Sequence, residues 1–308
     1  MALLGIEIGG TKLQAAVVSP AGEALASRHE ALASGSGASE VLASVERLLA
    51  AVMASTPDRI DAVGVGFGGP VDRGRGRVAA SYQVEGWGGF PLAAWVRDRL
   101  RLPVTLENDT NAATLAEAVH GAGRGCRSVV YTNSGSGIGA GWAIEGRIHH
   151  GRPPGEMELG HLLLSPEGPT VENSASGWSI DREICAAVEQ HPGGSLAAAA
   201  AGQKPSALLL GPALAAGDPQ AAAILDRAAR AYALGLSHVV HLLNPDAIGL
   251  GGGVAKIGEP WRRAVEGHLG RFVMKAFCPP PPVRLSLIGD LVVPVGAALV
   301  AAGNTRAE

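Results

Sequence analysis

The sequence predicts an α/β protein with two domains, and three observations lead to this prediction. The chain has 308 residues, which is enough for about two domains on the usual length prior. Its opening order is three apolar segments, a helical segment and another apolar segment, the β-β-β-α-β order of a mixed sheet with a helix on it. In the second half, the apolar run at 247–250 ends in three glycines before a helix, as strands of α/β sheets often do.

The composition is that of a protein with sizeable hydrophobic cores. Hydrophobic residues make up 47% and charged residues 17% of the chain, and the net charge of −3 gives no electrostatic case for a nucleic-acid or anionic-membrane partner. The three cysteines have no paired spacing, which is typical of a reducing cytoplasm. Neither a signal peptide nor an uncharged apolar run of about 18 residues is visible. We therefore expect a cytoplasmic enzyme.

The first half is expected to hold five strands and three helices. The segment 41–54 is helical because its apolar residues recur at helical spacing, whereas the apolar runs beside it are too short for helices. The glycine-rich stretch 74–89 is expected to be an irregular loop, and the GAGRG sequence at 121–125 marks a domain boundary. The expected strands are 3–8, 13–19, 23–30, 62–67 and 104–106, and the expected helices are 41–54, 91–100 and 108–119.

The second half is expected to alternate strands and helices. Asp218 and Pro219 form a cap and first-turn proline for a helix that ends before Asn244 and Pro245. The alanine-rich stretch 193–217 is also predicted to be helical. The other expected strands are 128–132, 161–164, 247–250 and 284–287, and the other expected helices are 179–190, 260–273 and 295–302.

The first candidate site is the hairpin GIEIGGTKLQAAVV at 5–18. Its turn offers backbone N–H groups, a hydroxyl and an ammonium in one small space, which suits a phosphate. The alternative is an ordinary hairpin, in which Gly-Gly turns are common.

Two standard nucleotide motifs are absent or incomplete. No G-x-x-x-x-G-K-[ST] occurs, because Thr11 precedes Lys12 in the closest match. Gly64, Gly66 and Gly69 satisfy G-x-G-x-x-G after a strand, but Pro70-Val71-Asp72 does not begin the helix that a dinucleotide site requires. We therefore do not expect a dinucleotide site.

Two further glycine elements lie in the second half. Gly135, Gly137, Gly139 and Gly141 alternate, which strips one face of a strand and allows a ligand or another backbone to approach closely. A bend or a close sheet contact is the alternative. With the first hairpin in view, a second phosphate-binding hairpin explains the pattern better. The third element is IGLGGGV at 248–254, at a strand end where an α/β sheet usually holds its ligand.

Polar residues that suit catalysis follow the strand at 104–106. In the run Glu107-Asn-Asp-Thr-Asn111, an Asn or Asp is the preferred helix N-cap, yet one cap needs only one such residue. Asp109 is a candidate general base for a hydroxyl proton. Glu158, His161 and Glu172 add two carboxylates and an imidazole downstream, with ordinary loop residues as the alternative.

The motifs IGGTK, GGPVD, ENDTN, ELGH and GLGGGV, in this order, resemble the ROK family of sugar kinases over essentially the whole chain. The resemblance implies the two-domain, actin-like ATPase (ribonuclease H-like) α/β fold with a central cleft. It implies a first domain at 1–120, to which a C-terminal helix at about 295–308 returns, and a second domain at 121–294.

The resemblance also implies roles for single residues. Asp109 would be the catalytic base that takes the proton of the sugar 6-hydroxyl, and Glu7 would hold Mg2+. The implied substrate-binding residues are Gly69, Asn108, Glu158, His161 and Glu172. The implied ATP-binding residues are Gly9, Gly10, Thr11, Lys12, Ser134, Gly135, Gly137, Gly252 and Gly253, the last two beside the adenosine.

This chain departs from the family pattern at three places. Glu7 stands where the family usually has Asp, so its carboxylate reaches one methylene further toward the metal. The stretch 168–177 lacks the cysteines of the family's zinc loop, which leaves His161 without thiolate partners, and we expect no zinc. The loop 81–87 lacks an Asn that often contacts the sugar, and Ser81 or Gln83 is expected to substitute for it.

These observations lead us to expect an ATP- and Mg2+-dependent kinase for the 6-hydroxyl of glucose or a related hexose, cytoplasmic and homodimeric. Fructose, mannose or an N-acetylhexosamine as acceptor, and polyphosphate as donor, are alternatives. A non-catalytic, sugar-sensing regulator is another. Regulators of the family carry an N-terminal helix-turn-helix of some tens of residues, whereas this chain reaches GIEIGGTK within five.

Overall fold

The computed structural model describes residues 2–33, 35–55, 59–81, 86–153, 155 and 157–305, which form two compact units. The first unit comprises Met1–Gly125, Gly141–Glu156 and Ile288–Glu308. The second comprises Cys126–Ala140 and Met157–Leu287. Compared with the expected division, the first unit also takes in residues 121–125, 141–156 and 288–294.

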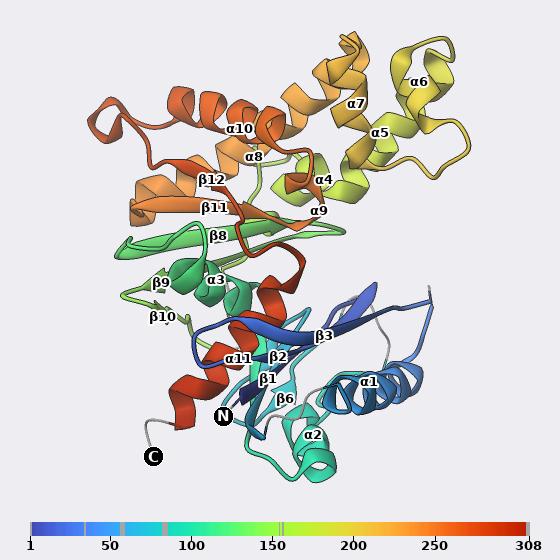
Figure 1. Ribbon diagram of the computed structural model, residues 1–308. Coiled ribbons are helices and arrows are strands. Elements are labelled where there is room, and N and C mark those ends of the chain that lie inside the picture. The colour runs from blue at the N-terminus through green and yellow to red at the C-terminus, as the bar shows by residue number, and fades with distance from the viewer. Residues whose placement is uncertain are drawn as a thin grey trace. The chain divides into compact units, whose positions relative to one another are not determined.

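The first unit is built on a five-stranded mixed sheet of order β3-β2-β1-β4-β7. Figure 1 labels its strands β1, β2 and β3. The strands β1, β2 and β3 are antiparallel neighbours, whereas β4 and β7 run parallel to β1. This arrangement confirms the mixed sheet that the β-β-β-α-β order predicts. The strands are β1 Ala2–Ile8, β2 Lys12–Val18, β3 Ala24–Ala31, β4 Ile60–Phe67 and β7 Val104–Asn108. The helices are α1 Ala38–Met53, α2 Leu92–Leu100, α3 Asp109–His120 and α11 Val292–Thr305.

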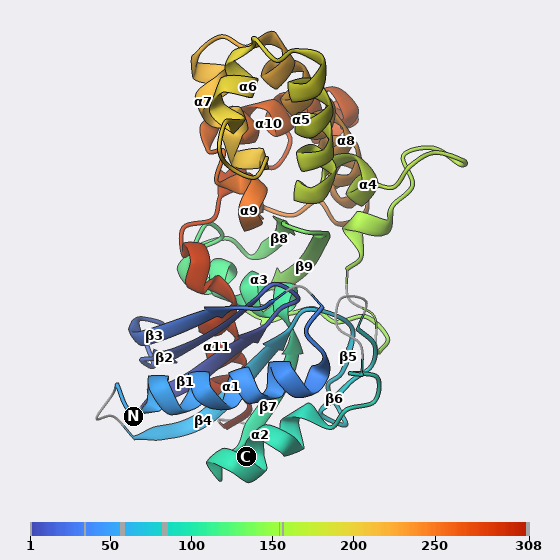
Figure 2. The same cartoon turned by 90° about the vertical axis from the view of Figure 1, so that its right-hand side faces the viewer.

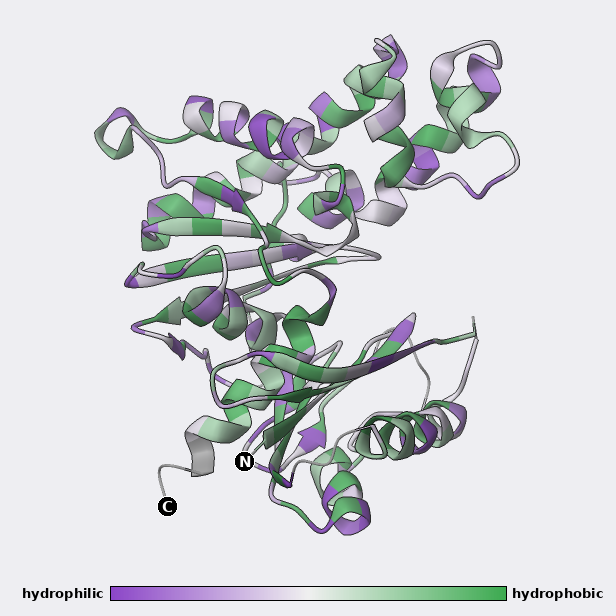
Figure 3. Cartoon of the chain, viewed as in Figure 1, coloured by the Kyte–Doolittle hydropathy of each residue, from purple (hydrophilic) through white to green (hydrophobic). Residues whose placement is uncertain are grey.

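The two faces of this sheet carry different helices (Figure 2). Leu4, Ile6 and Ile8 of β1 share a hydrophobic core with the apolar stripe of α1, as the helical spacing predicts. Gly5 and Gly64 point to the other face, where an added Cβ would overlap the backbone of α11. In Figure 3 hydrophobic residues run along the strands of both sheets.

The close approach of α11 explains the G-x-G-x-x-G pattern. A Cβ at Gly64 would overlap the Ala297 carbonyl, and a Cβ at Gly66 would lie 2.6 Å from Val293. After Gly69 the chain enters the short strand β5 Val71–Asp72, which pairs with β6 Arg77–Val78 inside the expected loop. No helix follows β4 directly, so these glycines serve packing and the dinucleotide motif is not formed.

The second unit contains the sheet strands β8, β11 and β12, which run parallel. The sheet order is β10-β9-β8-β11-β12, and β9 passes from the second unit into the first after Ala140. The strands are β8 Ser128–Ser134, β9 Ile138–Ile144, β10 Arg147–Ile148, β11 Ala247–Gly251 and β12 Val283–Leu285. The helices are α4 Val171–Ala175, α5 Gly177–Gln190, α6 Ser195–Ala200, α7 Leu210–Ala215, α8 Pro219–Leu243, α9 Gly252–Ala255 and α10 Glu259–Phe272. Short 3-10 turns are η1 Leu159–His161, η2 Ala207–Leu209, η3 Lys275–Phe277 and η4 Gly289–Leu291.

Helix α8 begins as predicted and the segment at 161–164 does not. The Asp218 side chain accepts hydrogen bonds from the N–H groups of Gln220 and Ala221, and Pro219 opens the first turn. The predicted strand at 161–164 is wrong: Leu159–His161 is the 3-10 turn η1, and Leu163 forms only an isolated bridge to Thr170. Three apolar residues resemble a strand, but here they have no longer partner strand to pair with.

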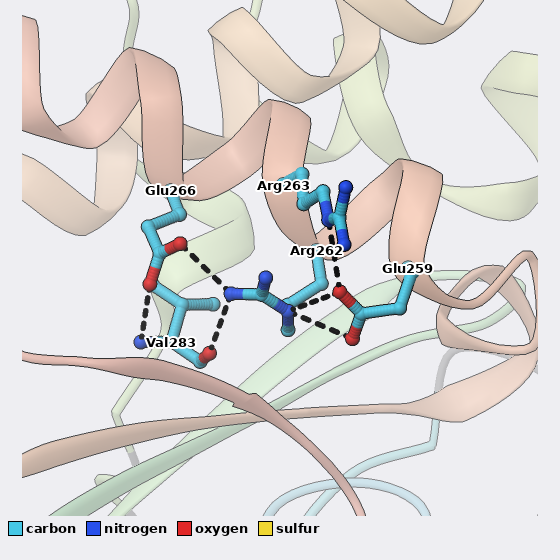
Figure 4. Close-up of polar contacts among 5 residues, drawn as sticks. All are labelled: Glu259, Arg262, Arg263, Glu266 and Val283. Atoms are coloured by element: carbon cyan, nitrogen blue, oxygen red, sulfur yellow. Dashed lines mark hydrogen bonds and ion pairs between the residues drawn. The ribbon is translucent and has the colours of Figure 1, made fainter.

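A network of charged residues fastens α10 to β12 (Figure 4). Arg262 Nε donates to both carboxylate oxygens of Glu259, at 2.9 and 3.0 Å. Its Nη1 donates to Glu266 at 2.8 Å and to the carbonyl of Val283 in β12 at 3.2 Å. The hydrogen bonds that Arg262 donates to these two carboxylates, Glu259 first, raise the pKa of Arg262 further above its usual value. The guanidinium therefore joins the first turns of α10 to the sheet.

We expect Arg262→Met to lower the free energy of unfolding by about 2 kcal/mol, because it removes charge-assisted hydrogen bonds of a side chain that is only 19% exposed. Arg263→Met is the matched control, since Arg263 is 75% exposed and bonds only Glu259 in the network. Urea denaturation of the two variants measures the difference. Equal losses in both would show that the network adds nothing beyond surface charge.

Among the described residues, no helix combines the length and the apolar character needed to cross a membrane.

Candidate active site

The junction of β7 and α3 positions the predicted catalytic residue. Asn108 ends β7 and caps α3: its Oδ1 accepts from the N–H groups of Thr110 and Asn111 at 2.9 and 3.0 Å. The Asn108 Nδ2 donates to the carbonyl of Gly69 at 3.3 Å, which joins two predicted sugar-binding residues. The preferred N-cap of the sequence is thus the residue before Asp109, and Asp109 is the first residue of the helix.

Asp109 presents its carboxylate at the start of α3, where the helix dipole favours a negative charge. Its Oδ1 accepts hydrogen bonds from the N–H of Thr110 at 2.7 Å and from the Thr110 hydroxyl at 3.2 Å. A Cβ at Gly68 would lie 3.3 Å from Asp109 Oδ2 and 3.3 Å from the Cα of Gly9. Gly68 therefore keeps the space beside this oxygen clear, a role that the sequence analysis missed. The signal was its place directly after the buried strand β4.

The turn after β1 brings Glu7 and Lys12 together. The N–H of Gly9 donates to the Lys12 carbonyl at 3.1 Å, which closes the hairpin. Lys12 Nζ lies 3.2 Å from Glu7 Oε2, an ion pair without the alignment of a hydrogen bond, and donates to Gln14 at 3.0 Å. Glu7 is 5% exposed, and burial raises its pKa to about 7 although Lys12 lowers it. The charge of Asp109 raises the same pKa further, so the two carboxylates feel each other.

The raised pKa of Glu7 makes the stability of the fold depend on pH. Between pH 4.5 and about 7 the folded protein holds a proton that the unfolded chain has lost, so the free energy of unfolding falls as the pH rises. In the natural chain we expect the free energy of unfolding to fall by about 3 kcal/mol between pH 4.5 and 8, and we expect Glu7→Gln to abolish this fall. Denaturation of both proteins across this range measures it. Parallel stability curves for the variant and the natural chain would contradict the prediction.

Glu107, which precedes the Asn108 cap, is a buried carboxylate to which the sequence analysis gave no separate role. It is 3% exposed, and its Oε1 accepts from the N–H of Asn108 at 2.9 Å and from Asn111 Nδ2 at 3.1 Å. Its Oε2 lies 2.8 Å from His150 Nε2 and 3.8 Å from Arg73 Nη1. The polar run at 107–111 was a signal for this residue, but nothing in the sequence pointed to His150.

In the second unit, the end of β8 and the glycine loop after it contact the ends of the helices α4, α5 and α9. The Ser134 hydroxyl donates to the carbonyl of Ala175 at 3.0 Å, and the N–H of Gly177 donates to the Gly135 carbonyl at 2.7 Å. Gly252 has a φ of +80°, and a Cβ added to it would lie 2.5 Å from the Ser134 carbonyl oxygen, so only glycine fits there. The structure therefore brings the predicted residues Ser134, Gly135 and Gly252 together, with Gly253 next in the chain.

The three predicted sugar-binding residues of this unit have different surroundings. Glu172 Oε2 accepts from the N–H of Ile138 at 2.8 Å and occupies the space that a side chain at Gly137 would need. Glu158 directly precedes the turn η1 and His161 ends it, with His161 Nε2 at 4.0 Å from Glu158 Oε2. The His161 side chain is 70% exposed, so it is open to a ligand.

The predicted residues thus form two groups, one in each unit. The group in the first unit lies at or just after the carboxyl ends of the parallel strands β1, β4 and β7 and comprises Glu7, Gly9–Lys12, Gly69, Asn108 and Asp109. In the second, Ser134 and Gly252 lie at the carboxyl ends of the parallel strands β8 and β11. These are the ends at which open α/β sheets hold their ligands.

Two further expectations concern the stretch 168–177, where no zinc is expected, and the loop 81–87, where a sugar contact is expected. In the part of the chain that the structure describes, no group of three or more His, Cys, Asp or Glu side chains is arranged to hold a metal ion. The stretch 168–177 forms the short helix α4, capped by Thr170, and the start of α5. Gln83, a candidate sugar contact, lies outside the described residues, whereas Ser81 lies within them.

Two solved structures are similar to the whole chain. A ROK family glucokinase from Streptomyces griseus, solved in complex with glucose and AMPPNP, has a TM-score of 0.88 and 28% identity, and the match covers 98% of this chain and 100% of that one. A ROK hexokinase from Thermus thermophilus has a TM-score of 0.80 and 29% identity, with 100% of both chains covered. With the mixed sheets described above, these likenesses confirm the predicted actin-like ATPase fold.

Sequence relatives agree with the structural ones. A glucokinase of Thermotoga maritima is 32% identical over 285 residues, which is 89% of this chain and 89% of the relative. The sequence profile of the ROK family matches residues 3–304. Since this match spans nearly the whole chain and confirms the prediction made from its motifs, the protein belongs to the ROK family.

Proposed function

We propose that this protein is an ATP-dependent hexose kinase that phosphorylates the 6-hydroxyl of glucose or a related hexose. The observation that carries the proposal is Asp109, a carboxylate at the first turn of α3 beside Gly68 and Gly9. A similar protein with 28% identity binds glucose and AMPPNP, a pair of ligands that matches a sugar acceptor and a nucleotide donor.

Asp109 would act as the general base of the transfer. As the hydroxyl oxygen of the sugar bonds to the γ-phosphorus of ATP, its O–H bond breaks and the proton passes to the Asp109 carboxylate. The bond between the γ-phosphorus and the bridging oxygen then breaks, and ADP leaves with the electron pair. The two donors of Thr110 hold Oδ1 and so fix the plane of the carboxylate. Positioning of this kind supplies much of the rate in phosphoryl transfer.

Each unit carries one candidate phosphate-binding loop. In the first unit the turn Gly9–Lys12 would bind through the Thr11 hydroxyl and the Lys12 ammonium, since the Gly9 N–H already donates to the Lys12 carbonyl. In the second unit the loop of Ser134, Gly135 and Gly137 would bind a phosphate. Gly252 and Gly253 at the start of α9 would lie beside the adenosine. Gly69, Asn108, Glu158, His161 and Glu172 would bind the sugar hydroxyls, with Glu172 already oriented by the N–H of Ile138.

Glu7 is the residue that would hold Mg2+. Among the described residues, none makes an aligned hydrogen bond to its buried Oε2, and a carboxylate oxygen is a ligand that Mg2+ accepts. When bound, Mg2+ neutralises charge on the phosphates of ATP. Because the pKa of Glu7 is about 7, a fraction of the molecules carries a proton on Glu7 at neutral pH. Binding of the ion would release this proton. A homodimer and a cytoplasmic location remain predictions, to be tested by light scattering and cell fractionation.

A panel experiment tests the proposed function. Purified protein receives Mg-ATP with glucose, fructose, mannose, N-acetylglucosamine or N-acetylmannosamine, and ADP release is measured while 31P and 13C NMR locate the phosphate on the sugar. We expect turnover on at least one hexose with the phosphate on its 6-hydroxyl. Polyphosphate in place of ATP tests the donor. If the protein binds a sugar but turns over no hexose with either donor, the result would favour a non-catalytic, sugar-sensing regulator instead.

A further inference from the structure

The buried carboxylate of Glu107 accepts hydrogen bonds from the start of α3, the helix whose first residue is Asp109. Its Oε1 holds two groups of that turn: the N–H of Asn108, which caps the helix, and the side-chain amide of Asn111. Asp109 stands between these two residues. A shift of the Glu107 carboxylate would therefore move the backbone from which the Asp109 side chain projects.

His150 fixes the other oxygen of this carboxylate. Its Nε2 lies 2.8 Å from Glu107 Oε2, and the imidazole comes from the segment after β10, which belongs to the same unit but is 43 positions away in sequence. The neighbouring ring of His149 packs on Trp142 at 4.6 Å between centroids, which anchors the same segment to β9. His150 is thus held in place independently of its bond to Glu107.

Two further contacts complete the surroundings of the pair. Arg73, from the turn between β5 and β6, places Nη1 at 3.8 Å from Glu107 Oε2, so the buried anion faces a cation and an imidazole. On the far side of Asn111, an added Cβ at Gly141 would lie 3.0 Å from the Asn111 Oδ1. The amide of Asn111 is therefore confined between Glu107 and the backbone of β9.

We propose that Glu107 and His150 are positioning residues for Asp109. The imidazole holds the carboxylate, the carboxylate holds Asn108 and Asn111, and these fix the orientation of the general base. The expected effect on kcat rests on the proposed kinase function, whereas the positioning of Asp109 rests on the hydrogen bonds alone.

The test compares three variants with the natural chain. His150→Leu has a similar volume and no hydrogen-bonding group, His150→Gln places an amide where it can donate to Glu107, and His238→Leu changes an exposed histidine of α8 as the matched control. We expect His150→Leu to lower kcat about 10-fold with the KM of ATP changed less than about twofold, because a small misplacement of a base is costly. His150→Gln is expected to recover most of kcat, and His238→Leu to retain it.

A second readout does not depend on activity. The backbone amide signals of Asp109, Thr110 and Asn111 in 1H–15N NMR are expected to shift in His150→Leu and to return toward their natural positions in His150→Gln. Unchanged amide signals and unchanged kcat in His150→Leu would overturn the inference. Equal losses of kcat in the Leu and Gln variants, together with a lower melting temperature in both, would show a merely structural contact and would also overturn it. If the natural chain turns over no hexose, the proposed function fails, whereas the NMR result still decides the positioning role.

Discussion

Asp109→Asn is expected to lower kcat for hexose phosphorylation by about 1,000-fold while the fold persists. The amide can still accept the hydrogen bonds of Thr110 through its oxygen, so the first turn of α3 keeps its geometry. It cannot take the proton of the sugar hydroxyl, and general-base catalysis contributes about 100- to 10,000-fold. ADP release under saturating ATP and hexose gives the change in kcat, and the KM values show whether binding survives.

The matched control for this variant is Asp98→Asn on α2. Asp98 is an exposed carboxylate that pairs only loosely with Arg97, at 3.6 Å, so its loss should leave kcat unchanged. Thermal unfolding of both variants confirms that each is folded before kinetics are compared. Turnover by Asp109→Asn equal to that of the natural chain would remove Asp109 from the role of the base.

Glu117→Ala is expected to lower the free energy of unfolding by about 3 kcal/mol. The Glu117 side chain is fully buried in α3, where Oε2 accepts from the N–H of Ala122 at 2.6 Å and Oε1 accepts from the N–H of Ile288 at 3.1 Å. Ala122 lies just before the chain first leaves the first unit, and Ile288 is the residue at which the chain enters that unit for the last time. Without the carboxylate, these two backbone N–H groups lose an acceptor. Each loss is expected to lower the free energy of unfolding by about 1–3 kcal/mol.

Urea denaturation of Glu117→Ala measures this loss, and Glu183→Ala is its control. Glu183 also bonds a partner in its own unit, Arg227 at 2.5 Å, but as an ion pair at the surface it is expected to contribute less than about 1 kcal/mol. A loss in Glu117→Ala no larger than in Glu183→Ala would mean that water replaces the carboxylate at both N–H groups. A second variant, Glu117→Gln, keeps one acceptor oxygen. Its loss in the free energy of unfolding is therefore expected to lie between those of Glu117→Ala and Glu183→Ala.

The strands and long helices of this chain were largely predictable because local patterns specify them. The three opening strands, the helix α1 and the cap of α8 by Asp218 lie close to the expected positions, since each depends on periodicity or on residues a few positions apart. The predicted strand at 161–164 was wrong because a strand needs a partner, and Leu163 forms an isolated bridge to Thr170 after the 3-10 turn Leu159–His161.

The glycines show where pattern and structure diverge. Gly64 and Gly66 fit a dinucleotide motif by spacing, but the backbone and side chains of α11, from the end of the chain, explain them. Gly137 was expected to hold a phosphate, and its lack of a side chain is already required by the carboxylate of Glu172. Such contacts join segments that a sequence pattern does not connect.

By itself, the sequence determined the family, the α/β fold and the catalytic candidate, because short motifs such as ENDTN and IGGTK carry their chemistry within a few neighbouring residues. Only the tertiary structure decided the state of the groups around that candidate. The raised pKa of Glu7 comes from burial, and the bonds of Glu107 to His150 and of Glu117 to Ile288 span 43 and 171 positions. The physical reason is that burial and long-range hydrogen bonds depend on which distant segments meet when the chain folds.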